Sequence, residues 1–171
     1  MSEFNSSVVA QALLRQGRPF IEHGLDDAPC ARENGGILND PRCSYLAVDL
    51  NGEGYSCDGL IRRAICEAAG VELGEFSTDY THLHQWADLM ERRRKPRSDL
   101  IVVFLRKKFD VPVHAALQLD DGYEIFHATN REDENGKPVN MVTFGRYSPD
   151  NNRVRYIDPS RLAEVAITGL S

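Results

Sequence analysis

The chain has 171 residues and a formal net charge of −6, with 42% hydrophobic and 27% charged residues. This length and composition are typical of one globular domain that buries its own core, and the acidic balance argues against a dedicated nucleic-acid binder. No apolar stretch approaches the roughly 18 residues of a membrane-spanning helix, and the N-terminus lacks the basic and apolar segments of a secretory signal. We therefore expect no membrane span and synthesis in the cytoplasm.

The N-terminal third is expected to hold one helix and a long loop. A helix is predicted over residues 6–16, because apolar side chains recur at helical spacing after Ser6 and Ser7, either of which can cap it. Residues 25–54 are rich in Asp, Asn, Gly and Pro and predict a long loop, interrupted by a short strand over residues 45–48. Loops of this length inside a compact domain are usually functional or disordered.

Two further helices are predicted in the middle of the chain. The first runs from Cys57 to Ala69, with an apolar stripe along one side and Gly70 at its end. The second is predicted over residues 81–94. It ends in a basic run that we interpret as a solvated helix end whose charge complements the helix dipole: Arg92, Arg93, Arg94, Lys95 and Arg97.

After Pro96 the apolar period changes from that of a helix to that of strands. Five strands and a final short helix or turn are predicted over residues 99–105, 111–119, 123–129, 139–144, 153–157 and 158–165. Helices followed by a run of antiparallel strands indicate an α+β protein. The chain shows no internal repeat and is expected to form a single domain over residues 1–171.

Cys57 is the first candidate for chemistry, because it opens a predicted helix. A helix N-terminus carries partial positive charge and free backbone N–H groups, which favour the reactive thiolate and can also stabilise an oxyanion. A buried structural cysteine is the alternative, and position alone does not decide between the two. The other cysteines, Cys30, Cys43 and Cys66, fit no zinc-binding spacing, although an oxidising compartment would allow Cys30 and Cys43 to pair.

Two of the five histidines lie on predicted neighbouring strands. An Asp121-Gly122 turn predicts a hairpin whose register pairs residue 114 with residue 129, and residue 116 with residue 127. His114 and His127 then share one face of the sheet as diagonal neighbours, with Cβ atoms ~7–8 Å apart. The remaining histidines are expected in a loop or on the surface: His23, His82 and His84.

Together these residues suggest the nucleophile, base and orienting group of a catalytic triad. Cys57 would be the nucleophile, His114 the base that activates it, and His127 the group that orients His114. Two unrelated, exposed strand histidines are the alternative interpretation. No third ligand at a suitable spacing accompanies the two histidines, so no metal site is expected.

The sequence resembles a known family, the NlpC-type cell-wall cysteine peptidases, which are papain-like. The resemblance extends over residues 6–130 and rests on several short pieces that occur in the family's order. These pieces are G-R-P-F-I-E-H-G (17–24), S-C-D-G-L-I (56–61), S-D-L-I-V-V-F (98–104), H-A-A-L-Q-L-D-D-G (114–122) and I-F-H-A-T (125–129).

The resemblance implies a papain-like fold, with N-terminal helices packed on a central antiparallel sheet, and one NlpC-like catalytic domain with a loop insertion at about residues 25–54. It implies Cys57 as nucleophile, His114 as base and His127 as the third polar residue. The implied reaction is hydrolysis of peptide bonds in peptidoglycan stem peptides, typically next to D-glutamate, by an acyl-enzyme route without cofactor. The implied partners are stem peptides or muropeptides.

Three residues near the nucleophile are candidates for substrate binding and depart from the family pattern. The family's Asp-Cys-Ser is here Ser56-Cys57-Asp58, so acid and hydroxyl are exchanged. The acid before the cysteine helps to hold a free amine of the stem peptide in some members, which leaves open whether Asp58 replaces it. Phe20 stands where the family usually has a tyrosine. The loop at 25–54 is longer than usual and is expected to line or cover the cleft.

Two other functions stay open on the same scaffold. One is a non-catalytic binding or structural module, for example in a phage tail, and the other is an acyltransferase or deamidating toxin. Neither a signal peptide nor a wall-binding module is seen, which favours phage-borne or other non-classical delivery to the cell wall, or action on recycled peptides in the cytoplasm. Such routes would add an immunity protein, or phage or secretion machinery, as partners.

Overall fold

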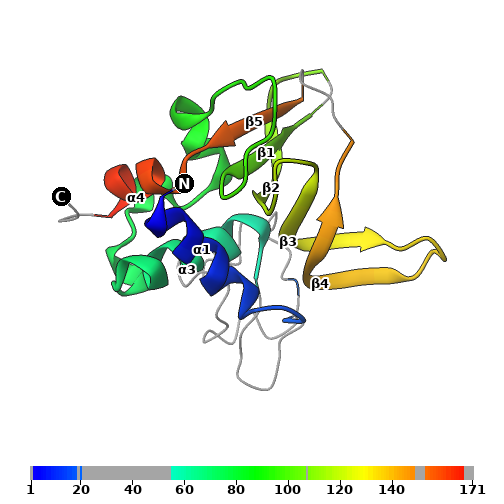
Figure 1. Cartoon of the computed structure of the whole chain (residues 1–171), viewed down its shortest axis with the longest axis horizontal. Helices are drawn as coiled ribbons and strands as arrows, with labels where there is room; N and C mark the ends of the chain where they lie inside the picture. The colour runs from blue at the N-terminus through cyan, green and yellow to red at the C-terminus, as the bar shows by residue number, and fades with distance from the viewer. Residues whose placement is uncertain (1, 19, 21–54, 107, 149–152, 168–171) are drawn as a thin grey trace.

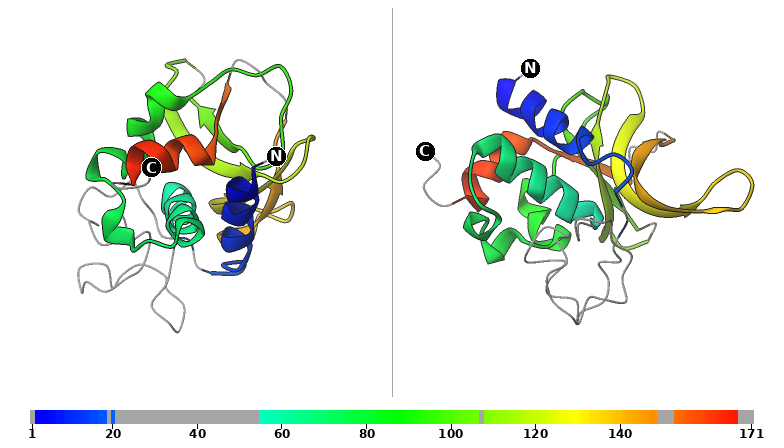
Figure 2. Two further views of the ribbon diagram at one scale, coloured as in Figure 1. Left: turned by 60° about the vertical axis from the view of Figure 1, so that its left-hand side comes forward. Right: turned by 90° about the horizontal axis from the view of Figure 1, so that it is seen from below.

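The computed structural model describes residues 2–18, 20, 55–106, 108–148 and 153–167 (Figure 1). It shows an α+β protein in which helices gather on one side of a five-stranded antiparallel sheet, as the sequence predicts (Figures 1 and 2). The loop expected at 25–54, with its short strand at 45–48, lies outside the described residues, as do His23, Cys30 and Cys43.

The first helix, α1 (Glu3–Leu13), begins and ends earlier than the sequence predicts. Its cap is Ser2, whose side chain accepts a hydrogen bond from the backbone N–H of Asn5. The prediction of Ser6 or Ser7 as the cap is therefore wrong. Ser6 instead lies inside the helix and donates its hydroxyl hydrogen to the Asp99 carboxylate at 3.1 Å, a partner from the start of the sheet.

The helix α3 (Cys57–Ala69) confirms the prediction at both ends. Ser56 caps it by accepting a hydrogen bond from the backbone N–H of Gly59 at 3.1 Å. Gly70 ends it in the left-handed conformation, with φ of 71°, which glycine adopts without steric cost. Leu60, Ile61 and Ile65 are fully buried, so the apolar stripe does face the core.

The helix predicted over residues 81–94 is wrong. Three short 3₁₀ helices follow α3: η2 (Leu73–Glu75), η3 (Thr78–Tyr80) and η4 (Leu83–Leu89). After η4 the chain is extended, and Glu91 forms an isolated bridge with Tyr156. The basic run at 92–97 therefore lies on an irregular segment with a bend, not at a helix end. The buried Trp86 ring connects η4 to η3, because its indole N–H donates to the Tyr80 carbonyl at 2.7 Å.

The sheet has the strand order β4-β3-β2-β1-β5, and every neighbouring pair is antiparallel. Its strands are β1 (Ile101–Leu105), β2 (Pro112–Gln118), β3 (Glu124–Glu132), β4 (Pro138–Arg146) and β5 (Val154–Ile157). The last helix, α4 (Pro159–Ala166), begins with Asp158 as its cap and proline in its first turn. The β3–β4 ribbon extends away from the rest of the molecule (Figure 1).

Both faces of the sheet bury apolar side chains. The face toward α1, α3 and α4 carries the main core, to which β2 and β3 contribute Ala115, Leu117 and Phe126. The opposite face carries a smaller cluster formed by Leu100, Val102, Ala116, Ile125, Val154 and Tyr156. Sheets covered on both faces show near-continuous apolar runs, which is why β1 has no alternation.

Candidate active site

Cys57 is the first residue of α3, and its helix end meets the sheet at β2. The side chain is buried, with 8% exposed. The backbone N–H groups of Ala115, Asp58 and Cys57 lie close enough to its sulfur to favour the thiolate. Ala115 directly follows His114 in β2. The fold therefore brings the thiol beside the strand that holds His114.

The pKa of the Cys57 thiol is raised to about 12 from its ordinary value of 9.0, mainly because burial penalises the thiolate and because the Asp58 carboxylate lies close by. The three backbone N–H groups act in the opposite direction, as expected of a helix N-terminus. Burial outweighs them, so the resting group is a neutral thiol. The position of Cys57 at the helix start therefore favours the thiolate, as the sequence indicates, but does not by itself produce one.

His114 and His127 are in direct contact. His114 Nε2 lies 2.7 Å from His127 Nδ1, and the two ring centroids are 4.9 Å apart. The pairs Leu117–Phe126 and Gln118–Ile125 have the hairpin register that the Asp121-Gly122 turn predicts. The prediction that the two imidazoles share one face as neighbours is therefore confirmed.

A bulge in β2 lies immediately before His114. Phe104 of β1 pairs with His114, but the next residue, Leu105, pairs with Pro112, so Val113 has no partner in β1. Bulges of this kind bend a strand and redirect its side chains, and they are frequent beside active sites. On the other side, the pairing of β2 with β3 reaches only to Leu117. The ladder between β2 and β3 ends at this pair, and the first residue of α3 lies near Ala115 of β2.

Both histidines are held neutral at ordinary pH. Burial lowers the pKa of His114 to about 4 against the opposing charge of Asp58. Burial, and then the charges of His114 and Arg131, lower the pKa of His127 to about 3. Because Nε2 of His114 is bonded to His127, the nitrogen of His114 that remains for the thiol is Nδ1. Phe104 stacks on the His114 ring, with centroids 5.7 Å apart.

Ser56 and Asp58, expected to bind substrate, are both fully buried. The Ser56 hydroxyl donates to Asp58 Oδ1 at 3.0 Å, and the backbone N–H of Leu83 donates to Asp58 Oδ2 at 2.9 Å. These bonds join the start of α3 to η4. A contact of either side chain with substrate stays a prediction.

Phe20, the third expected substrate contact, is partly buried and packs against the main core. It forms an isolated parallel bridge with Tyr55, two residues before Cys57, and its backbone N–H donates to the Asn140 carbonyl at 3.0 Å. Phe20 therefore lies near the start of α3, and its role in binding also stays a prediction.

Three features of the site escaped sequence analysis: the bulge at Val113, the Ala115 N–H and the position of Gly145. The bulge and the N–H depend on pairing between distant strands, which leaves no local sequence signal. Gly145 is different, because a glycine inside a strand often marks a close approach of another group. The sequence predicts a strand that ends at residue 144, which leaves Gly145 outside it.

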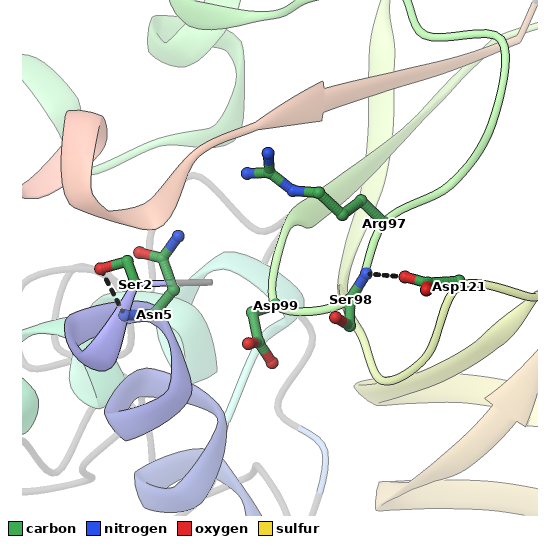
Figure 3. A pocket seen from close by; sticks show the side chains of 6 residues that line it. All are labelled: Ser2, Asn5, Arg97, Ser98, Asp99 and Asp121. Carbon is green, nitrogen blue, oxygen red and sulfur yellow. Dashed lines mark hydrogen bonds between the residues drawn. The ribbon is translucent and has the colours of Figure 1, made fainter.

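Other features of the described residues do not extend the site. A cavity of about 220 Å³ lies at the N-terminus of α1 and is lined by Ser2, Asn5, Arg97, Ser98, Asp99 and Asp121 (Figure 3). None of the three candidate catalytic residues lines it. Among the described residues, no group of three or more potential metal ligands occurs, and no helix has the length and apolar character needed to span a membrane.

The fold is that of NlpC/p60 domain proteins. RipD from Mycobacterium tuberculosis, described as a non-catalytic NlpC/p60 domain protein adapted to peptidoglycan binding, matches with a TM-score of 0.54 and 15% identity over 92% of this chain and 98% of its own. The resuscitation promoting factor interacting protein RipA and a hypothetical invasion protein of Mycobacterium tuberculosis each match with a TM-score of 0.52 and 12% identity. These matches cover 91% of this chain and 61% of theirs. No protein-family model and no curated protein matches the sequence.

Proposed function

We propose that this protein is a cysteine peptidase or amidase that hydrolyses peptide bonds in bacterial peptidoglycan stem peptides, next to D-glutamate. The observation that carries the proposal is the meeting of Cys57, at a helix start, with the strand that holds His114, while His114 is bonded to His127 at 2.7 Å. Nucleophile, base and orienting group in this order are the requirement for acyl transfer through a thioester.

The first half of the reaction follows from the resting protonation states. Neutral His114 accepts the thiol proton at Nδ1 as the Cys57 sulfur attacks the peptide carbonyl. His114 Nε2–H donates to His127 Nδ1 throughout, which keeps the ring in the orientation and tautomer that leave Nδ1 free. The backbone N–H groups at the start of α3 stabilise the oxyanion. The C–N bond then breaks, the imidazolium gives its proton to the leaving amine, and the acyl group stays on Cys57.

The second half regenerates the enzyme. His114 Nδ1 removes a proton from water, which attacks the thioester carbonyl, and the C–S bond breaks. The proton on His114 returns to the Cys57 sulfur, and the product leaves as a carboxylic acid. No metal or cofactor is needed for any step.

The choice of peptidoglycan as substrate rests on the fold and on the sequence pieces around the site. RipD, with the same fold, is described as having a peptidoglycan-binding function. Ser56 and Asp58 contribute to catalysis by fixing the N-terminal start of α3, which carries Cys57. Phe20 contributes by closing the site beside Tyr55. Action at the cell wall after phage-borne or other non-classical delivery fits this substrate.

A non-catalytic binding module is the second candidate function. It is favoured by the description of RipD as non-catalytic and by the raised pKa of the Cys57 thiol, which leaves little thiolate at neutral pH. An acyltransferase or deamidating toxin would use the same thioester with a different acceptor or amide. The products therefore distinguish all three functions.

The test is digestion of purified muropeptides from several wall chemotypes with wild type and Cys57→Ala, read by mass spectrometry. Cys66→Ala, which changes the other buried cysteine of the same helix, nine residues after Cys57, is the matched control. We expect wild type and Cys66→Ala to give new fragments and Cys57→Ala to give none. Equal patterns for wild type and Cys57→Ala, or no fragments from wild type in any chemotype, would contradict the peptidase function. Binding of wild type to insoluble peptidoglycan without cleavage would identify the binding module.

A further inference from the structure

Gly145 on β4 lies against the outer nitrogen of His127. Gly145 pairs with Ile125, and His127 is two residues further along β3, so the missing side chain of Gly145 and the His127 ring are on the same face. A Cβ atom at position 145 would lie 2.8 Å from His127 Nε2 and 3.5 Å from His127 Cε1. Real Cβ atoms essentially never approach so closely, so the ring occupies space that only glycine leaves open.

The His127 ring is held by one hydrogen bond and otherwise by packing. Its Nδ1 is bonded to His114 Nε2, but Nε2 is buried and has no hydrogen-bond partner among the described residues. The side chain is only 7% exposed. Because no bond fixes the Nε2 end of the ring, its position depends on the surface against which it packs, and Gly145 is part of that surface.

We propose that Gly145 is a positioning residue of the candidate active site. Its lack of a side chain sets the position of the His127 ring, and the bond from His127 to His114 then sets the orientation of the base. The proposal rests on the proposed function, since it concerns the same reaction. It adds a residue that has no side chain to react and acts through His127.

The chemistry depends on which nitrogen of each ring carries the proton. His114 accepts the thiol proton at Nδ1 only while its own proton is on Nε2, which requires His127 Nδ1 to be the acceptor. An alanine at 145 pushes the ring away from β4, which lengthens or bends the 2.7 Å bond and releases His114 from that tautomer. The backbone at Gly145 itself tolerates alanine, because the positive φ glycines among the described residues are Gly17, Gly70 and Gly136.

The experiment compares Gly145→Ala with the matched control Gly74→Ala, which places a Cβ where no heavy atom lies within 4 Å. Muropeptide cleavage is measured as kcat and KM, and side-chain ¹H–¹⁵N spectra report the tautomers of His114 and His127. We expect Gly145→Ala to lower kcat about 10- to 100-fold with little change in KM, as a misplaced catalytic group does. The His114 signals should shift in this variant and stay in place in Gly74→Ala.

A second background separates positioning from general damage. His127→Asn keeps an acceptor, Oδ1, near the position of Nδ1 but removes Nε2 and Cε1, the atoms that a Cβ at 145 would approach most closely. In this background Gly145→Ala should change neither kcat nor the His114 signals by a further measurable amount. If Gly145→Ala does not fold, the double variant should fold, because the close contact is gone.

Two results would overturn the proposal. One is a Gly145→Ala protein with the kcat and His114 signals of wild type. The other is an equal loss from Gly145→Ala in the wild-type and His127→Asn backgrounds. The spectra decide the matter even if wild type cleaves no muropeptide, so failure of the peptidase function and failure of the positioning role are distinguished.

Discussion

The two halves of the candidate site are stabilised in different ways. At the N-terminal start of α3, the side chains of Ser56 and Asp58 are both hydrogen-bonded. Ser56 is bonded to Gly59 and Asp58, and Asp58 to Ser56 and Leu83. The histidine pair has one short hydrogen bond, and one buried nitrogen has no partner. The start of α3 is therefore fixed by hydrogen bonds, whereas the histidine pair is fixed mainly by packing of Phe104 against His114 and of Gly145 against His127.

This difference predicts that damage to the two halves has different consequences. Removing a bonded partner at the helix end leaves buried donors unsatisfied and lowers stability. Changing the histidine pair breaks only one hydrogen bond among the described residues, so the main effect is a lower rate of the reaction. The variants below separate the two halves on that basis.

The largest effect is expected from His114→Gln, which removes the base but keeps a polar side chain. The rate of muropeptide cleavage should fall about 10²- to 10⁴-fold, the usual contribution of a general base. The urea midpoint should change less than it does in the helix-end variant described next. Cleavage within a few-fold of wild type would show that His114 is not the base.

Asp58→Ala is expected to have the next largest effect, on stability. It leaves the Ser56 hydroxyl and the Leu83 N–H without an acceptor, which should cost about 3 kcal/mol in the free energy of unfolding. Urea denaturation measures the loss, with exposed Asp79→Ala in η3 as the control. Equal midpoints for the two variants would contradict the structural role of the helix-end network.

How much of this contrast the sequence reveals can be seen from particular residues. The sequence predicts helix α3, its end at Gly70 and the register that joins His114 to His127, because a helix-ending glycine and a two-residue turn have local signals. The start of α1 was misplaced, because the role of Ser6 depends on Asp99, which is distant in the sequence. Burial of Cys57, which reverses the expected shift of its pKa, arises from tertiary packing that no local pattern encodes.

The pH dependence of stability tests the histidine half without any substrate. Because the pKa values of His114 and His127 are lowered to about 4 and about 3 from 6.5, the unfolded chain binds protons first as pH falls. Stability should therefore decrease by a few kcal/mol, roughly, between pH 7 and pH 4. The combined His114→Gln and His127→Asn variant should lose much of this slope, while exposed His84→Gln should keep it. An unchanged slope in the combined variant would show that the histidines are not buried in neutral form.

Above pH 9 the stability is expected to change with pH in the opposite direction. The Cys57 pKa is raised to about 12 from 9.0, so the folded state keeps its proton longer than the unfolded chain, and stability should decrease as pH rises above 9. Cys57→Ala should remove this part of the decrease.

The smallest effect is expected from His127→Asn. The amide oxygen can accept the His114 Nε2–H in place of Nδ1, so cleavage should fall less than about 10-fold, whereas His127→Ala should fall further because no acceptor remains. Measurement of kcat for both variants shows whether His127→Ala loses more activity than His127→Asn. Equal losses would mean that His127 does not act as the acceptor.

The most direct test of the central claim is covalent labelling with a stem-peptide analogue that carries an acyloxymethyl ketone in place of the scissile amide. Intact-mass and peptide mass spectrometry identify which of the four cysteines reacts, and at what rate. We predict a single adduct on Cys57, none on buried Cys66, and a rate at least ~10²-fold lower in His114→Gln. Labelling of Cys57 no faster than Cys66, or at the same rate with and without His114, would contradict the assignment of nucleophile and base.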